Sequence, residues 1–485
     1  MLLHMLISSQ AHFMGRFRDY LAYRKTVEKS NRSATNPGIQ DYDIVRHPWK
    51  HGQHFMCGSN VTNYFEQKGL YCFAYFQKAY NPNMAQYGPA PLYSINPKNF
   101  IASLTGQGGG KAYEQFYKYF YKQRFLLHWG GMADPFCNFE KKNRVTWEIL
   151  NALGDLAYPT LFSFKGDTIF EDQYLNLFDK YRHQHNFAFQ VSIITADDDL
   201  AKLVEVGVPS PTKRLEALKI LADMGYWTIL RLRPFIIGVT DKTLDELLER
   251  ALAAGIRGIS TEFFAIDHRC TDGMSKRYDW LAKIIGVDNL MKYYTTLSPA
   301  ERGGYCRLNR DVKEQYIKKI YKFCEKHGLT LGISDPDFKE LCTSGSCCAM
   351  PDVFPENPEM CNWTRNQLTY HIKECRRNFH KGSGSTEMFF NDVFNDEQSP
   401  YLSEHEFANY YVGVISRNAA ERSLFTPKLL MQEHWNNLRS PKNPRNYFHG
   451  KITPVRLDDE GNYVFRYVEH DYERRWKKEG IDLTF

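Results

Sequence analysis

Short apolar runs alternate with amphipathic segments along the middle of the chain. Six runs rich in apolar residues have the length of strands, at 54–61, 125–132, 158–165, 187–194, 226–233 and 257–264. Segments with helical spacing of apolar positions follow four of them, at 144–156, 171–183, 211–224 and 244–254. Strands that alternate with helices in this way predict parallel βαβ units. Right-handed crossovers would curl these units into a partial TIM-type (β/α)6 barrel, with its active face at the carboxyl ends of the strands.

The pattern changes on both sides of this region. The run 329–334 predicts a seventh strand, after which the chain becomes rich in cysteine and turn residues. A helix is expected around 404–422, and two alternating runs around an Asp-Glu-Gly-Asn turn predict a β-hairpin at 454–468. We therefore predict an N-terminal lead-in, a barrel, a cysteine-rich segment and a C-terminal helix and hairpin appendage, at 1–53, 54–340, 341–380 and 381–485.

Composition narrows the class of protein. A chain of 485 residues with 31 Tyr and 33 Phe can fill one large α/β core and carry appendages. The net charge of +6 permits an anionic partner without arguing for one. No apolar run reaches membrane-spanning length, and the N-terminus lacks the charged leader and cleavage site of a signal peptide. We expect a cytoplasmic protein with no membrane partner, whose 11 cysteines are reduced, metal-bound or buried.

Several motifs occur in an order and at intervals that carry a family resemblance. They are NVTNYFEQKGLYCFAY at 60–75, WGGMADPF at 129–136, EKKNRVTWEIL at 140–150, YPTLFSFKGDTIFED at 158–172, the segment 190–226 with its VGVPSPTKRLEAL stretch, and RLRPFIIGVTD at 231–241. Together they resemble the spore-photolyase-like branch of the radical S-adenosylmethionine (SAM) superfamily. The resemblance covers roughly residues 54–265 and implies the radical SAM type of partial barrel.

The resemblance also implies a cofactor pair. In this family three cysteines in a C-x3-C-x2-C loop hold a [4Fe–4S] cluster that binds SAM, and one electron then cleaves SAM to a 5′-deoxyadenosyl radical. Here Cys72 matches the third cysteine, whereas Phe65 and Gly69 stand at the other two positions. Neither residue supplies a thiolate, so we do not expect the standard radical chemistry from this loop.

The resemblance carries over a set of SAM contacts. Gly130 and Gly131 would hold the amino group of SAM, because glycine lets backbone groups approach a ligand closely. Four further candidates lie in the same motifs: Asp134 in the glycine-rich turn, and Lys165, Ser192 and Arg214 for the SAM carboxylate or ribose.

Other residues near the predicted strand ends have two interpretations. Cys57 and Cys137 could join Cys72 in a substitute metal site, but small buried cysteines are the commoner case and the one we favour. His128, just before the glycine-rich turn, could line the pocket, and we favour a core histidine on a strand.

A second cysteine group follows the barrel. Cys342, Cys347, Cys348 and Cys361 have the spacing C-x4-C-C-x12-C, which matches no specific zinc signature. Adjacent cysteines rarely bind one ion together, so either Cys347 or Cys348 would be a ligand. The alternatives are a structural zinc or auxiliary iron–sulfur site, and a reduced set of cysteines that packs the loop.

Three functions follow from these observations. The first is a radical SAM-like protein that binds SAM, an iron–sulfur cluster or both, with altered or absent radical chemistry. The second is a working radical SAM enzyme with non-standard cluster ligands. The third is a nucleic-acid-associated scaffold or regulatory protein built on an inactive barrel, for which the nucleic-acid partner is suggested by family analogy alone.

Overall fold

The computed structural model describes residues 68–69, 71, 97–107, 117, 121–122, 124, 126–130, 134–267, 272–297, 301–302, 305–358, 368–395, 427–440 and 442–485. The predicted lead-in, the predicted strand at 54–61 and the predicted helix at 404–422 lie outside them.

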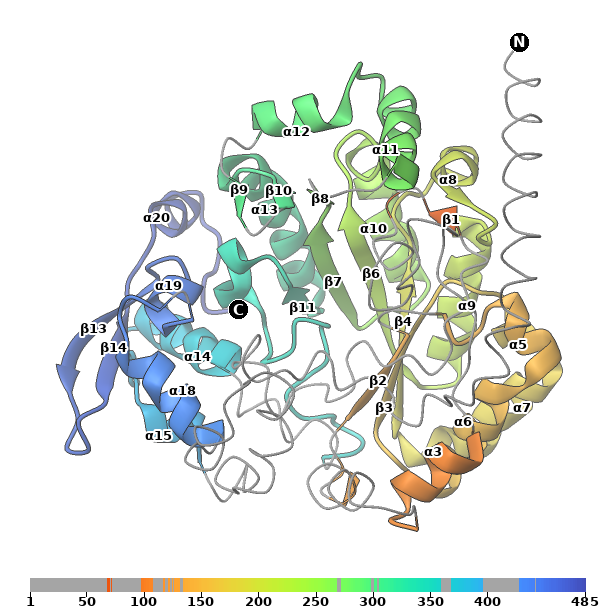
Figure 1. Cartoon of the computed structure of the whole chain (residues 1–485), viewed down its shortest axis with the longest axis horizontal. Coiled ribbons are helices and arrows are strands. Elements are labelled where there is room, and N and C mark those ends of the chain that lie inside the picture. The colour runs from red at the N-terminus through yellow and green to blue at the C-terminus, as the bar shows by residue number, and fades with distance from the viewer. Residues whose placement is uncertain are drawn as a thin grey trace.

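A six-stranded parallel sheet forms the centre of the molecule, with the order β11-β7-β6-β4-β3-β2 (Figure 1). Its strands are β2 (Leu127–Trp129), β3 (Thr160–Phe164), β4 (Phe187–Ser192), β6 (Trp227–Phe235), β7 (Gly258–Phe263) and β11 (Thr330–Ile333). All neighbouring pairs are parallel, and successive strands lie side by side as right-handed βαβ units require. The predicted α/β fold with a partial TIM-type barrel is therefore confirmed, and the run at 329–334 supplies one of its strands.

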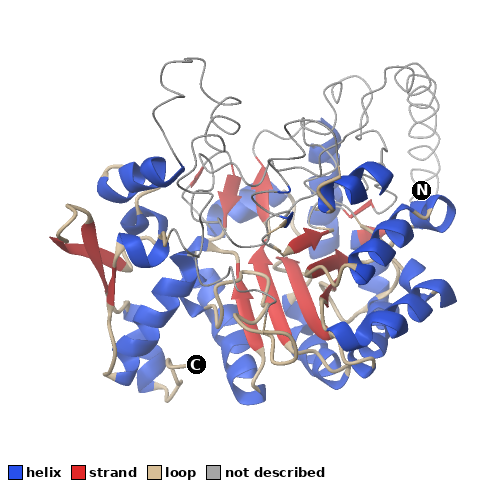
Figure 2. Ribbon diagram, turned by 90° about the horizontal axis from the view of Figure 1, so that it is seen from below, coloured by secondary structure: helices blue, strands red, loops and turns tan. Residues whose placement is uncertain are grey.

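Helices connect the strands and cover the outside of the sheet (Figure 2). Capping explains several of their ends: Ser210 accepts a hydrogen bond from the N–H of Lys213 just before the proline that starts α9, and Gly328 ends α13 with a φ of +64°. The helices of this part are α3 (Pro97–Leu104), α5 (Asn138–Asn143), α6 (Val145–Asp155), α7 (Asp172–Tyr181), α8 (Asp198–Val204), α9 (Pro211–Asp223), α10 (Leu244–Ala253), α11 (Asp272–Ile285), α12 (Leu290–Leu297) and α13 (Arg310–His327), with 3₁₀ turns at Thr168–Phe170, Arg182–Gln184, Asp241–Thr243 and Pro336–Leu341.

The two faces of the sheet are filled differently. Large aromatic side chains occupy the outer face, where the rings of Phe162 and Phe189 stack with centroids 5.3 Å apart beneath the helices. The inner face begins with smaller apolar residues that pack against the cysteine-rich segment in a separate cluster, made by Leu126, Leu161, Ala188 and Ile229 with Cys348, Ala349, Met350 and Phe354. Because side chains alternate along a strand, the outer face builds the core and the inner face is left for other contacts.

Two small sheets lie beside the barrel. One pairs β1 (Lys68–Gly69) with β5 (Glu205–Val206), and the other has the order β8-β10-β9, from Ala265–Asp267, Tyr305–Arg307 and Glu301–Arg302. Both are antiparallel. The first of them brings the motif at 60–75 against the segment that follows β4.

The C-terminal part adds a three-stranded antiparallel sheet of order β12-β14-β13, which Figure 1 places across the molecule from α5 and α7. The predicted hairpin is confirmed: the carboxylate of Asp458 accepts hydrogen bonds from the N–H groups of Glu460 and Asn462 in its turn. The elements are α14 (Leu368–Lys381), β12 (Glu387–Met388), α15 (Phe390–Val393), α18 (Pro427–Asn436), α19 (Pro444–Tyr447), β13 (Ile452–Leu457), β14 (Tyr463–Tyr467) and α20 (Asp471–Lys478).

Buried polar groups join this part to the barrel. Glu340, which follows β11, is fully buried and accepts hydrogen bonds from Lys451 and from the hydroxyl of Tyr472. The Lys451 ammonium also donates to the backbone carbonyl of Asp337. The two parts therefore share a polar junction, and the domain boundaries stay predictions. No helix in the described ranges is both long and apolar enough to cross a bilayer.

Candidate functional site

The ends of three neighbouring strands bring together most of the predicted SAM residues. Gly130 follows β2, Lys165 follows β3 and Ser192 ends β4. Gly130 has a φ of +99°, and a Cβ added to it would lie 1.8 Å from the backbone oxygen of Ser163. Glycine is therefore required here by the close approach of the two strand ends.

Asp134 fixes the backbone at this edge. One of its carboxylate oxygens accepts hydrogen bonds from the N–H groups of Lys165 and Gly166, both at 2.8 Å, and the other accepts from the N–H of Phe136 at 2.9 Å. The side chain is buried. Asp134 therefore ties the turn after β2 to the end of β3, which gives it a positioning role, and its direct contact with SAM stays a prediction.

Glu205, at the start of β5, lies at the centre of the site and was not singled out from the sequence. Its side chain is fully buried, and its two oxygens face Lys165 Nζ at 2.8 Å and Arg214 Nη2 at 2.6 Å. Tyr71 donates its hydroxyl hydrogen to the same carboxylate. Burial acts to raise the pKa of Glu205, but Arg214 and Lys165 outweigh it and lower that pKa to about 2. The carboxylate is therefore ionised at neutral pH.

Arg214 connects a helix to this carboxylate. It projects from α9, is 2% exposed, and donates from Nη1 to the backbone oxygen of Ser192 at 2.5 Å. Because its terminal nitrogens contact Glu205 and the end of β4, Arg214 connects the Glu205 carboxylate to the end of β4. The half-buried Lys165, whose side chain is 17% exposed, is the more accessible cation.

The predicted cluster loop reaches the same carboxylate. Gly69 pairs with Glu205 in the antiparallel contact between β1 and β5. Two residues later, the ring of Tyr71 lies 4.6 Å from Lys165 Nζ, measured to the ring centroid. The structure therefore places one of the two substituted cysteine positions beside the predicted SAM residues. Phe65, Cys72, Gly131 and Cys57 lie outside the described part of the chain.

The chemistry of the donor set separates the two implied cofactors. A [4Fe–4S] cluster held in this loop needs three thiolates, and the sequence has one, at Cys72, with Phe65 and Gly69 in the other positions. The loop residues do not fit the cluster. Lys165 and Arg214 share the carboxylate of Glu205, and Lys165, whose side chain is 17% exposed, is the cation that a ligand can reach. An accessible ammonium fits the carboxylate of SAM.

A chain of hydrogen bonds crosses the inner face of the barrel. His128 Nε2 lies 2.7 Å from Ser163 Oγ, which donates to Gln190 Oε1 at 2.7 Å, and Gln190 Nε2 donates to the backbone oxygen of Cys348 at 2.6 Å. His128 is buried on β2, as expected for a core histidine on a strand. Because buried polar groups need partners, this chain fixes the cysteine-rich segment to three strands.

The cysteine-rich segment acts here through its backbone. The oxygen of Cys347 accepts hydrogen bonds from Arg233 and from Ser260, and the oxygen of Ala349 accepts one from Thr330 at 2.6 Å. A Cβ on Gly332 of β11 would lie 2.3 Å from the nitrogen of Ala349. The segment therefore passes directly against the inner face, where the strand glycine leaves room for it.

The predicted second metal site is only partly described. Cys342 is buried, and its sulfur exchanges hydrogen bonds with the backbone N–H and oxygen of Ile333, at 3.2 and 3.5 Å. Burial raises the pKa of this thiol to about 12. Within the described ranges, no three His, Cys, Asp or Glu side chains are grouped to hold a metal ion. Cys361 lies outside these ranges, so the site stays a prediction. Cys137 is buried, as expected.

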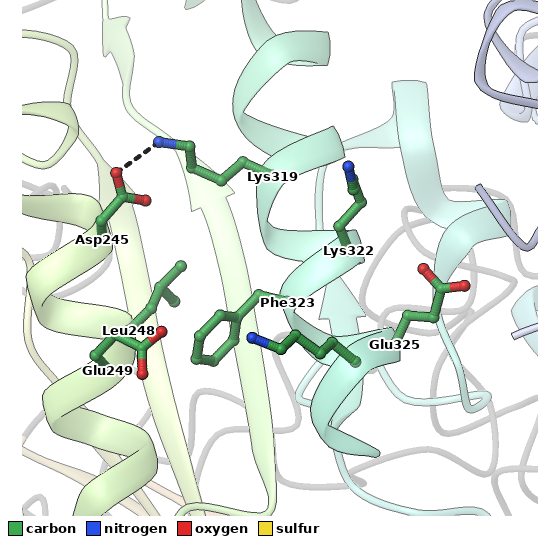
Figure 3. Close-up of a pocket in the computed structure, with 8 residues that line it drawn as sticks. Asp245, Leu248, Glu249, Lys319, Lys322, Phe323 and Glu325 are labelled. Carbon is green, nitrogen blue, oxygen red and sulfur yellow. Dashed lines mark hydrogen bonds and ion pairs between the residues drawn. The ribbon is translucent and has the colours of Figure 1, made fainter. Parts of the chain in front are cut away.

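A groove on the outer helical layer contains none of the predicted residues. It lies between α10 and α13, where Leu248 and Phe323 face the gap and Lys319 pairs with Asp245 at 2.8 Å (Figure 3). Both of its walls are helices on the outside of the barrel. It is therefore a surface feature separate from the strand ends.

Comparisons with known proteins give low similarity. No protein-family model matches the sequence, and no curated protein matches it. Among solved structures, spore photoproduct lyase complexed with dinucleoside spore photoproduct has 14% identity and a TM-score of 0.38, over 53% of this chain and 70% of that one. A cysteine-to-serine mutant of the same lyase has 12% identity and a TM-score of 0.40, over 54% and 71%. Streptococcus suis SuiB bound to SAM has 12% identity and a TM-score of 0.35, over 61% and 52%. The fold described above rests on the strand order and connections of this chain.

Proposed function

We propose that the chain is a radical SAM-like protein that binds SAM at the carboxyl ends of β2, β3 and β4, without the standard cluster-dependent chemistry. The observation that carries the proposal is the network of Lys165, Glu205 and Arg214 beside the Gly130 turn. Four separate sequence motifs meet there, in the order and at the strand ends that the family resemblance implies. The accessible ammonium of Lys165 favours a ligand that carries a carboxylate.

Each residue has a distinct part in this proposal. Lys165 would bind the SAM carboxylate, because it is the cation that solvent reaches. The backbone around Gly130 would accept the amino group, and Ser192 would lie next to the ribose or carboxylate. Arg214 and Asp134 would position these groups. When SAM is bound to a reduced iron–sulfur cluster it supplies a carbon radical, and this loop lacks the thiolates for that step.

Calorimetric titration of SAM into the iron-free protein tests the proposal. We expect Lys165→Met to weaken binding by about tenfold or more, because a charge-assisted hydrogen bond is lost. Lys202→Met is the matched control: Lys202 is 69% exposed, pairs with Asp199 at the surface, and should leave the affinity unchanged. A wild-type protein that fails to bind SAM would contradict the proposal.

A second experiment tests the alignment of the loop. The double variant Phe65→Cys with Gly69→Cys should regain a cluster of about four irons after anaerobic reconstitution, measured as iron and acid-labile sulfide. The wild-type loop should not hold one. A double variant that binds SAM but no additional iron would count against the alignment of Phe65 and Gly69 with cysteine positions.

The remaining predictions need their own measurements. Zinc and iron analysis of a Cys361→Ser variant tests the metal site at the second cysteine group. Binding to DNA or RNA at two salt concentrations tests the nucleic-acid partner, since phosphate contacts weaken steeply with salt.

A further inference from the structure

The opposite half of the inner face is also polar and basic. Ser192, Arg231, Ser260 and Gly332 are register partners across β4, β6, β7 and β11, so they lie in one row on one face. Arg231 Nη1 is 3.3 Å from Ser192 Oγ. This row therefore continues from the proposed SAM end of the barrel towards β11.

Arg233 stands one step further along β6, on the same face. Its Nη2 donates to the backbone oxygen of Cys347, which also accepts a hydrogen bond from Ser260 Oγ at 3.2 Å. The guanidinium is therefore held over the cysteine-rich segment, with residues 346–350 as a floor. The side chain is half-buried.

The hydrogen-bonding capacity of Arg233 is incompletely used. Its Nε is buried and has no hydrogen-bond partner within the described chain. Burial acts to lower the pKa of Arg233, but Cys348, Cys347 and Glu262 raise it above its ordinary value, so the group stays charged. The half-buried guanidinium can therefore still donate hydrogen bonds to the oxygens of a ligand.

The shape of the group indicates the ligand chemistry. A guanidinium presents its N–H donors in a planar fork that matches two oxygens of a carboxylate or phosphate. Arg231 lies two residues away on the same face, with its Nη1 3.3 Å from Ser192 Oγ. We infer that the β6 side of the barrel interior binds an oxyanion of the substrate, a phosphate or carboxylate group, through Arg233 with Arg231 beside it.

This inference deepens the proposed function and rests on it for one point, that the anion belongs to a second molecule bound next to SAM. Lys165, just after β3, would hold SAM, whereas Arg233, on β6, would hold the substrate. The two sites lie on different strands and can be tested separately.

Binding of inorganic phosphate, followed by ³¹P NMR, with acetate as the competing carboxylate, provides the test. Arg233→Lys keeps the charge but removes the fork, and should weaken phosphate or acetate binding by about tenfold. Glu262→Gln removes the nearby carboxylate and should strengthen binding by about two- to fivefold. Arg182→Lys is the matched control, since Arg182 is 41% exposed at the surface.

The outcomes separate the inference from the proposed function. Stronger binding of phosphate than of acetate would indicate a phosphorylated substrate, and the reverse a carboxylate. Arg233→Lys should leave SAM binding intact, and Lys165→Met should leave phosphate binding intact. If both the Arg233 and Glu262 variants bind the anions as the wild type does, or if only Lys165→Met abolishes binding, the inference is overturned while the SAM site stands. If SAM fails to bind but Arg233-dependent anion binding persists, the proposed function fails instead.

Discussion

Two buried carboxylates of this protein have nearly the same partners, but their lysine partners differ in access to solvent. Glu205, at the barrel mouth, and Glu340, at the junction with the C-terminal part, are both fully buried, and each accepts hydrogen bonds from a lysine and a tyrosine hydroxyl. The lysine at the junction, Lys451, is 0% exposed, whereas Lys165 at the mouth is 17% exposed. The same chemistry therefore closes an interface in one place and leaves a cation within reach of a ligand in the other.

The largest expected effect tests the closed member of the pair. Lys451→Met should lower the free energy of unfolding by about 3–5 kcal/mol, because it leaves Glu340 buried without its counter-charge. Urea unfolding measures this loss. Pairing the change with Glu340→Gln should restore part of it, because the uncompensated charge is then gone. A single variant as stable as the wild type would show that the junction does not depend on this pair.

A smaller loss is expected at the barrel mouth. Glu205→Gln should lower the free energy of unfolding by about 2–3 kcal/mol, because Arg214 then loses its only close carboxylate in the described structure while Lys165 can turn to water. The same variant should weaken SAM binding, since the strand ends lose the group that joins them. Calorimetry on one preparation gives both values, and a loss equal to that at the junction would remove the distinction between the two carboxylates.

The two regions should also respond to acid at different pH values. At the junction, burial and the charges of Lys451 and Arg310 lower the pKa of His470 to about 4. The unfolded chain then takes up the proton first, so this contribution is present above about pH 6.5 and is lost progressively as the pH falls through 4. His470→Asn should flatten the stability profile in that window, as measured by urea unfolding across pH.

The mouth should weaken at lower pH. The pKa of Glu205 is about 2, below its ordinary value, so its contribution is full above about pH 4.5 and is lost as the pH falls through 2. The wild-type protein should therefore lose junction stability before mouth stability on acidification. The order would be reversed if Glu205→Gln, and not His470→Asn, changed the profile between pH 6.5 and 4.

The smallest change in the free energy of unfolding is expected in the outer groove. Its exposed ion pair gives the value with which the two buried carboxylates are compared. Lys319→Gln breaks an ion pair whose partners are 48% and 75% exposed, so the free energy of unfolding should change by no more than about 0.5 kcal/mol. A larger change would mean that exposed pairs contribute as much as buried ones in this protein, and would weaken the contrast between Glu205 and Glu340.

The sequence was sufficient for the barrel and insufficient for its most buried charges. Strands such as 187–194 are continuous apolar runs bounded by helical patterns, so their position follows from local periodicity. The partners of Glu205 come from positions as distant as Tyr71 and Arg214, and no local pattern encodes such a meeting. A signal was present in LVEVGV, where one carboxylate stands in an apolar run and needs a buried counter-charge.

The cysteine-rich segment shows a second limit. The density of Cys342, Cys347 and Cys348 drew attention to thiol chemistry, whereas the backbone oxygens of Cys347 and Cys348 accept hydrogen bonds from strand side chains and the sulfur of Cys348 lies in an apolar cluster. The types of side chain in a segment indicate which ligands it could bind, but they do not indicate where its backbone will pack against other strands. Gly332 and Gly258, two glycines inside strand runs, were the usable hint, since a missing side chain within a strand marks a close backbone approach.

The floor made by residues 346–350 also has a consequence for the order of folding. Its backbone oxygens bond to side chains of β4, β6, β7 and β11, so it can dock only after those strands have assembled. Cys348, which is 0% exposed, becomes protected at that moment. The rate at which its thiol escapes a labelling reagent during refolding should therefore time the closure of the barrel.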